Sequence, residues 1–204
     1  MTPTPENPKL DPQLEAIFKQ LLQEVTLLTL KWQNARDLFS SKERVEVLNR
    51  TAGGFFGLVQ ITFRDDAFLA LSRLTDPLQS ASKDNLTILR LLEHLDRNGH
   101  PSFHESLEKQ IATAIDKCNP FRLWRNKKLA HSDLGTALKV ATEPLPGVSV
   151  KQINDAVESL QLIMNSFNQY FFDTTTVFDS IIQSGGPDSL IHHLRRGLEA
   201  AEKE

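Results

Sequence analysis

Fixed positive charge is concentrated near the middle of this chain, in a segment that also holds a histidine. Residues 121–133 read F-R-L-W-R-N-K-K-L-A-H-S-D, and four cations fall within seven residues: Arg122, Arg125, Lys127 and Lys128. His131 follows three residues later. Arginine offers phosphate oxygens a planar fork of donors, and histidine exchanges a proton near neutral pH. These residue types suit a phosphodiester, and a base that activates a ribose 2′-OH would select RNA over DNA.

The spacing of these residues determines whether they can act on one group. On a continuous helix, Arg125 and His131 would lie roughly 120° apart, with Lys128 between them. A long arginine side chain covers that arc, so the three side chains could converge on one anion. On this interpretation, Arg125 and His131 would do the chemistry, and Arg122, Lys127 and Lys128 would contact phosphate.

A plainer interpretation of the same segment stays open. Cations near the carboxyl end of a helix stabilise its dipole, and His131 lies just before Ser132, Asp133 and Gly135. A run of charges is also more often a solvated surface than a site. The residues alone do not decide between these two interpretations.

The composition limits what the whole chain can be. Its 204 residues suffice for one domain, with 40% hydrophobic and 24% charged residues, as in globular proteins. A net charge of −3 argues against a dedicated duplex binder. Cys118 is the single cysteine, which excludes an intramolecular disulfide and favours a buried thiol over a nucleophile. We see no signal peptide and no membrane-spanning run, so the expected location is the cytoplasm.

Helical periodicity dominates the first half of the chain. A helix is predicted from about 12 to 38, with Asp11 as its N-cap. Ser40 and Glu43 form a capping box that starts a second helix, and Gly53-Gly54 predicts a kink in it. This second helix is apolar nearly all round, so we expect it to be central and buried on more than one side.

The second half of the chain is predicted to be helical as well. A short helix stops at Asn98-Gly99, and a longer one opens at Pro101. Asn119-Pro120 should break that helix immediately before the basic segment. Ser149 and Gln152 form a capping box for a long amphipathic helix. No segment reads as a convincing strand.

These elements predict an all-α protein, a single-domain bundle of about five to six helices. The expected organisation is a disordered proline-rich tail over residues 1–10, the helical domain over 11–182, and an appended helix and tail over 183–204. No cofactor is expected. A metal site is not expected either, because His100 precedes Pro101 at a helix cap and His104 has no evident third ligand.

Two segments, taken in order, resemble a known family. The sequences S-R-L-T-D-P at 72–77 and W-R-N-K-K-L-A-H-S-D at 124–133 resemble the AbiU-type, abortive-infection branch of the HEPN superfamily. The superfamily motif is an arginine, a spacer of four to six residues and a histidine, and the spacer between Arg125 and His131 is five. The resemblance covers roughly residues 10–175 and implies an all-α, HEPN-like domain.

That resemblance also implies a function and a set of roles. Many members are metal-independent RNases in which the Arg and His of two protomers meet across a dimer interface, whereas others only bind RNA, a nucleotide or a partner. Carried over, Arg125 would stabilise the phosphate, His131 would be the general base or acid, and Asn126 would position the substrate or the histidine. The implied partners are RNA, a second copy of the chain, and an antitoxin or regulatory protein.

The supporting residue that the family often adds from another helix has no unique candidate in the sequence. Arg73, Asp76 and Asp66 are the candidates. Arg73 and Asp76 stand three residues apart on a helix, so they could instead pair with each other, and we favour that structural role.

Three hypotheses about function therefore remain. The first is a HEPN-type endoribonuclease acting as a toxin or antiphage effector, which requires Arg125 and His131 in one exposed cleft. The second is a HEPN-like binding module, which requires an exposed basic patch and tolerates loss of His131. The third is a helical scaffold, in which His131 is buried or caps the backbone.

Overall fold

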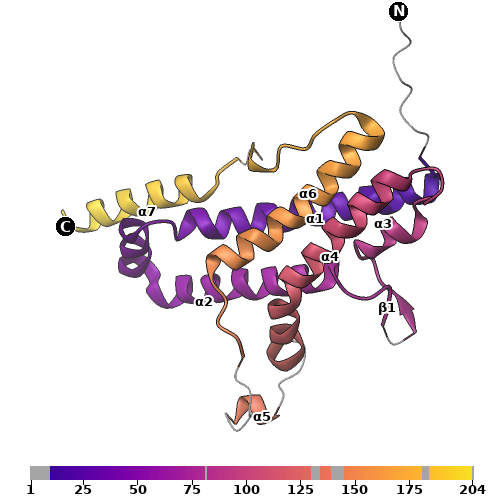
Figure 1. Ribbon diagram of the computed structural model, residues 1–204. Coiled ribbons are helices and arrows are strands. Elements are labelled where there is room, and N and C mark those ends of the chain that lie inside the picture. Colours follow the sequence, from indigo (N-terminus) through magenta and orange to yellow (C-terminus); the bar gives the residue numbers. More distant parts are fainter. Residues whose placement is uncertain (1–9, 81, 130–133, 139–144, 181–183, 204) are drawn as a thin grey trace, which may run out of the picture.

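Helices make up most of the structure. The computed structural model describes residues 10–80, 82–129, 134–138, 145–180 and 184–203. The long helices are α1 (Pro12–Leu38), α2 (Lys42–Leu74), α4 (Pro101–Trp124) and α6 (Val150–Phe172), and the shorter ones are α3 (Leu89–His94), α5 (Leu134–Ala137) and α7 (Pro187–Ala201). In Figure 1, α1 and α2 form a long hairpin, and α4 and α6 pack together against it. The all-α class predicted from the sequence is confirmed.

Local capping signals account for several helix boundaries. The carboxylate of Asp11 accepts hydrogen bonds from the backbone N–H groups of Gln13 and Leu14, and Pro12 occupies the first helical position. At the start of α6, Ser149 and Gln152 form the predicted capping box. Each of these bonds joins residues at most three positions apart, so the sequence alone predicts both starts.

The start of α2 is shifted by one residue from the prediction. Its N-cap is Ser41, whose side chain accepts from the backbone N–H of Arg44. Ser40 is not the cap, because its hydroxyl donates to the carbonyl oxygen of Asp37 at the end of α1. The predicted kink is present beside the glycine pair, at Ala52, where φ is −158° and ψ is 61°.

The core lies where the four long helices meet. Aromatic side chains from three of them stack at one end of it. Phe167 is completely buried, and its ring centroid lies 4.4 Å from that of Phe18 and 4.7 Å from that of Phe171. On the other side of the core, the ring centroids of Phe68 of α2 and Phe121 of α4 lie 5.1 Å apart. This packing holds α4 against α2.

The outward face of α2 is more exposed than the sequence predicts. Phe55 is 63% exposed and Leu58 is 66% exposed, so α2 is not buried on all sides of its apolar surface. The prediction that α2 is central and buried on more than one side is nevertheless confirmed, since α2 packs on α1, α4 and α7. Apolar periodicity does not distinguish an internal core from a surface that meets another molecule, so it did not reveal the exposed part.

The segment between α2 and α4 contains the only extended pairing among the described residues. Strands β1 (Gln79–Ser80) and β2 (Lys83–Asp84) pair antiparallel for two residues each. Arg90 of α3 ties this hairpin to the bundle through the carboxylate of Asp84 and the carbonyl oxygen of Leu78. The hairpin corrects the expectation of no strand, but its length does not alter the all-α class.

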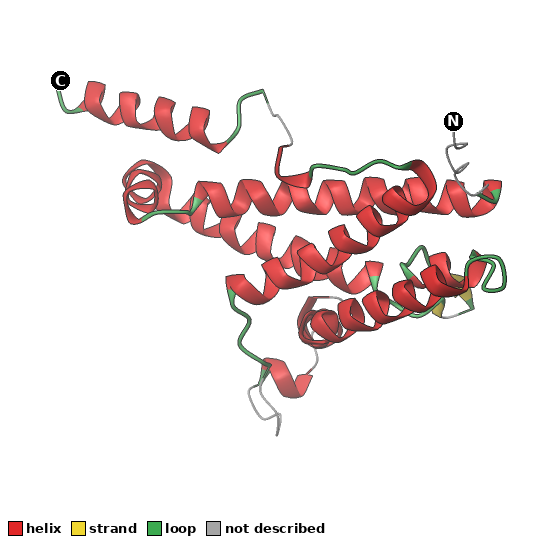
Figure 2. Ribbon diagram, turned by 45° about the horizontal axis from the view of Figure 1, so that its top comes forward, coloured by secondary structure: helices red, strands yellow, loops and turns green. Residues whose placement is uncertain are grey.

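The last helix, α7, packs on the kinked half of α2 and on α1, beside the turn between them (Figures 1 and 2). It contributes Ile191 to a second apolar cluster that is separate from the main core and also contains Leu38, Leu48 and Phe56. Ion pairs join Arg44 to Asp188 and Arg50 to Glu202 along the same contact. The predicted domain boundary at residue 183 stays a prediction.

Candidate functional site

The basic segment follows directly from the end of α4. The predicted break at Asn119-Pro120 is wrong, because α4 continues through Pro120 as far as Trp124. Phe121 is completely buried against Phe68, and this packing outweighs the helix-breaking tendency of the proline. The helix then widens into a π-helical turn, η1 (Arg125–Leu129). Such turns are rare and are frequently found at functional sites.

A wide turn changes the geometry on which the sequence argument rested. The rotation of about 100° per residue that placed Arg125, Lys128 and His131 on one arc belongs to a regular α-helix. Arg125–Leu129 does not follow it. His131 itself lies outside the described residues, so its predicted position is untested.

Asp76 connects the basic segment to the end of α2. Its carboxylate accepts a hydrogen bond from Nη1 of Arg125, and its Oδ1 lies 3.6 Å from Nε of Arg122. The Asp76 side chain is only 13% exposed, and those of the two arginines are 22% and 23% exposed. One mostly buried carboxylate therefore faces two partly buried guanidinium groups, and the cluster carries a net positive charge.

Arg122 has a structural role in this cluster. Its Nη2 donates to the backbone carbonyl and to the hydroxyl of Thr75, the C-cap residue of α2, and its Nη1 donates to Asn119. A cation at the carboxyl end of a helix satisfies free carbonyls and interacts favourably with the helix dipole. Arg122 thus fastens α4 to the end of α2, and contact with phosphate stays a prediction for it.

Two neighbouring side chains among the described residues hold Arg125 in place. Nη1 is bonded to Asp76, and Nε donates to Oδ1 of Asn126 at 3.0 Å. Nη2 has no hydrogen-bond partner within the described part of the chain. The guanidinium is therefore oriented by Asp76 and Asn126, and no described residue competes with an anion for its Nη2. Asn126 thus contacts Arg125, and the role that the resemblance implies for it, positioning the substrate or His131, stays a prediction.

The two lysines of the segment differ in their surroundings. The Nζ atom of Lys128 lies 5.0 Å from the ring centroid of Trp124, and the guanidinium of Arg64 lies 5.6 Å from the same ring. Trp124 is fixed by its Nε1–H, which donates to the carbonyl oxygen of Pro146. Lys127 makes no hydrogen bond or ion pair with any described residue. Arg64 is also paired with Asp65 at 2.7 Å, so Lys127 and Lys128 contribute most of the positive charge beside Arg125.

The predicted supporting residues separate in the structure. Arg73 pairs with Glu24 of α1 at 2.7 Å, and Asp66 pairs with Lys31 at 3.2 Å. The favoured pairing of Arg73 with Asp76 is therefore wrong, because Arg73 points to a neighbouring helix. Asp76 is the candidate that meets the basic segment.

Two residues of this site were not predicted, Thr75 and Arg64. Thr75 receives the Arg122 guanidinium, and Arg64 lies over Trp124, which is 60 positions further along the chain. The only sequence signal for Thr75 is its place at a helix end, where a hydroxyl can bond back to a carbonyl four residues earlier, as it does to Leu71. No local signal identifies Arg64.

Cys118 lies beneath this cluster, and the structure supports the prediction of a buried thiol. Burial raises its pKa to about 12, an effect that the hydroxyl of Thr75 and the charge of Arg122 oppose. We expect a disulfide reagent at pH 8 to label the native protein about a thousandfold more slowly than the guanidinium-unfolded protein, since the thiolate is the reactive form. As Cys118 is the single cysteine, absorbance of the released thiol reports on it alone. Equal rates in the two states would contradict its burial.

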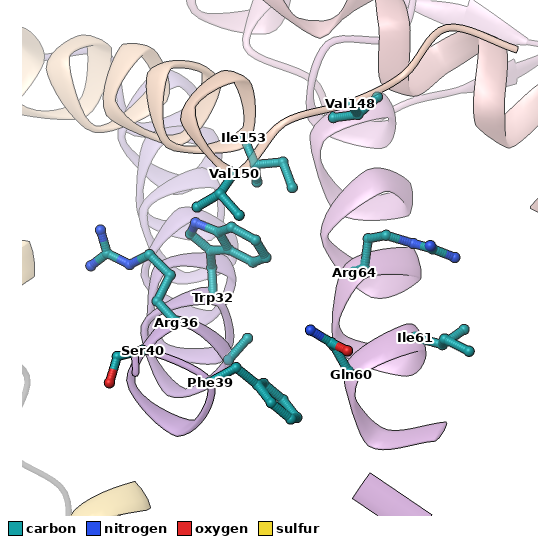
Figure 3. Close-up of a pocket in the computed structure, with 11 residues that line it drawn as sticks. Trp32, Arg36, Phe39, Ser40, Gln60, Ile61, Arg64, Val148, Val150 and Ile153 are labelled. Carbon is teal, nitrogen blue, oxygen red and sulfur yellow. The ribbon is translucent and has the colours of Figure 1, made fainter. Parts of the chain in front are cut away.

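A cavity of about 620 Å³ opens between α1 and α2, bordered by the start of α6. Figure 3 shows Trp32, Phe39 and Val150 around it, facing the Gln60 amide across the gap. The guanidinium groups of Arg36 and Arg64 are turned outward from it. The cavity is therefore mainly apolar, with cations at its margin.

Within the described residues, no group of three or more His, Cys, Asp or Glu side chains could hold a metal ion. None of the described helices is long and apolar enough to cross a bilayer.

The fold and the site together define an all-helical domain with an arginine positioned at the junction of two core helices. Comparison with protein families identifies it: the chain belongs to the AbiU2 family of HEPN domains, whose model matches residues 11–196. That match includes most of α7. No curated protein and no solved structure matches the chain.

Proposed function

We propose that this HEPN-type domain is a metal-independent endoribonuclease of the toxin or antiphage class, in which Arg125 stabilises the phosphate and His131 transfers the proton. The observation that carries the proposal is the Arg125 guanidinium, which Asp76 and Asn126 orient while no described residue accepts a hydrogen bond from its Nη2. An oriented donor with one free face can bind the charge that develops on a phosphate in the transition state. Lys127 and Lys128 would bind neighbouring phosphates.

The chemistry follows from the two residue types. A neutral histidine removes the proton from a ribose 2′-OH, and the resulting oxygen attacks the adjacent phosphorus. The guanidinium stabilises the added negative charge on the phosphate oxygens. The bond to the 5′ oxygen of the next nucleotide then breaks, which leaves a 2′,3′-cyclic phosphate, and the leaving oxygen takes a proton from the imidazolium or from water. Under this proposal DNA is not a substrate, because it lacks the attacking hydroxyl.

A second candidate function is binding of RNA without cleavage. It is favoured by the ion pair between Asp76 and Arg125, because a carboxylate beside the guanidinium reduces the positive charge available to a transition state. A binding module tolerates this loss, since Lys127, Lys128 and the Arg125 Nη2 still attract phosphate. Under either function, the proposed setting is the cytoplasm, with an antitoxin or regulatory protein as a further partner.

The proposal is tested by incubating a mixed RNA pool in EDTA with wild type, Arg125→Ala and His131→Ala. Cleavage by wild type alone supports the nuclease. If none of the three proteins cleaves RNA but the wild type binds it, the binding module is supported instead.

The nuclease proposal includes a homodimer, and the exposed apolar face of α2 is the surface we propose for it. Phe55 and Leu58 lie more than half exposed one helical turn apart, and Gly54 and Gly57 leave open space around them. The double substitution Phe55→Glu and Leu58→Glu should weaken dimerisation at least about a hundredfold, because burial of each apolar side chain in the interface contributes about 1.5–3 kcal/mol. Light scattering over a concentration series measures this. Leu162→Glu, on α6 and 56% exposed, is the control that should stay dimeric.

A further inference from the structure

The cavity between α1 and α2 has the composition of a site for a flat, aromatic ligand. Its volume of about 620 Å³ falls within the range of small-molecule sites, roughly 300–1,000 Å³. None of its eleven lining residues is acidic. Arg64, one of them, is paired with the carboxylate of Asp65 at 2.7 Å, so the positive charge at the cavity margin comes mainly from Arg36.

The aromatic surface of the cavity is held rigidly in place. Trp32 is 8% exposed, and its Nε1–H donates to Oδ1 of Asn154 at 2.7 Å. The polar edge of the indole is thereby satisfied away from the cavity, so an apolar ring surface borders it beside Phe39 and Val150 (Figure 3). Fixed aromatic surfaces of this kind bind bases by stacking.

One polar group points into the apolar space. The side-chain amide of Gln60 faces the cavity in Figure 3 and makes no hydrogen bond with any described residue. An amide carries both a donor and an acceptor, which is the combination that reads the edge of a nucleobase. Gln60 is an exposed residue, so water can satisfy its amide until a ligand covers it, and a purely apolar ligand would then leave the amide without a partner.

Two of the residues that line the cavity lie next to the basic segment. Arg64 lines the cavity and lies over Trp124, the residue immediately before Arg125. Val148 also lines the cavity, two residues beyond Pro146, whose carbonyl receives the Trp124 indole N–H. A strand whose phosphate lies at Arg125 therefore has a path along Trp124 and Arg64 into the cavity.

We propose that this cavity binds one base of a single-stranded RNA, near the phosphate held by Arg125. The base stacks within the Trp32 side of the cavity, Gln60 hydrogen-bonds its edge, and Arg64 lies along the connecting backbone. The inference rests on the proposed interaction with RNA and applies to cleavage and to binding alike. It assigns sequence preference to α1, α2 and α6, and affinity for phosphate to the basic segment.

The test uses the full chain and fluorescein-labelled hexamers of 2′-O-methyl adenylate, cytidylate or uridylate, which cannot be cleaved because the attacking hydroxyl is blocked. Fluorescence anisotropy gives the dissociation constants. Val150→Trp fills the cavity from a position that is 58% exposed, so the core is unchanged. Val177→Trp, at a position 62% exposed and away from the cavity, is the matched control. Gln60→Leu removes the amide and keeps the volume.

We expect wild type to bind one hexamer at least about tenfold more tightly than another. Val150→Trp should raise the dissociation constant of the tightest complex at least about tenfold, because one stacked base is lost. Val177→Trp should leave that constant unchanged. Gln60→Leu should reduce the difference in dissociation constant between the hexamers. Arg125→Ala should weaken the binding of all three hexamers by the same factor. If Arg125→Ala weakens binding but Val150→Trp changes none of the three constants, the cavity does not hold a base and the proposed function stands. If wild type binds no hexamer, both proposals fail.

Discussion

If the chain cleaves RNA as proposed, replacing Arg125 with alanine is expected to reduce cleavage about 10²–10³-fold, because it removes a charged donor for the reacting phosphate. The effect should appear in the rate of the chemical step, since the guanidinium acts most strongly on the charge that develops there. Single-turnover cleavage of an end-labelled RNA in EDTA, with enzyme in excess, measures this step. Arg125→Lys should recover little of the rate, because an ammonium cannot bond Asp76 and a phosphate in the planar arrangement of a guanidinium.

Arg73→Ala is the matched control for this variant. Arg73 lies close in sequence to Asp76, but its guanidinium pairs with Glu24 and is 65% exposed. Its loss should change cleavage less than twofold, since an exposed ion pair contributes little. Equal losses in the two variants would mean that general charge, and not the orientation of Arg125, determines the activity.

The largest expected effect on stability comes from Phe167→Ala. Phe167 is completely buried, and its ring packs against Phe18, Phe171 and Phe103 from three helices. Removing the ring leaves a cavity at the crossing of α1, α4 and α6, so the free energy of unfolding should fall by about 3–5 kcal/mol. Urea denaturation followed by circular dichroism measures the change.

The control for Phe167→Ala is Leu162→Ala on the same helix. Leu162 is 56% exposed, and its truncation should change the free energy of unfolding by less than about 0.5 kcal/mol. The two substitutions differ in burial more than in helix propensity. A small decrease in the free energy of unfolding for Phe167→Ala would show that the neighbouring aromatic rings move into the space left by the Phe167 ring.

The position of Asp76 has a consequence for both proposed functions. It holds Arg125 in place and, by its charge, weakens the attraction of that side chain for an anion. Its Oδ1 and the Nε of Arg122 are buried and lack hydrogen-bond partners within the described part of the chain. An incomplete hydrogen-bond set of this kind has room to rearrange when a phosphate approaches Arg125.

The sequence alone determined the all-α class, the starts of α1 and α6, and the segment that carries the concentrated charge. These features depend on bonds and periodicities within a few residues. The carboxylate of Asp11 reaches N–H groups two and three positions away, and Ser149 reaches Gln152, so neither needs the rest of the chain. The family resemblance likewise rested on two short segments, and the match over residues 11–196 confirmed it.

Only the tertiary structure decided which side chains meet. Asp76 accepts a hydrogen bond from Arg125, which is 49 positions away in the sequence. Arg73 pairs with Glu24, although Asp76 is closer to it in the sequence. These pairings depend on the angles at which α2 packs against α1 and α4. The number of residues between two positions does not determine those angles. The continuation of α4 through Pro120 has the same cause, because burial of Phe121 outweighs a local preference. Local bonding thus sets the helices, and packing between them sets the site.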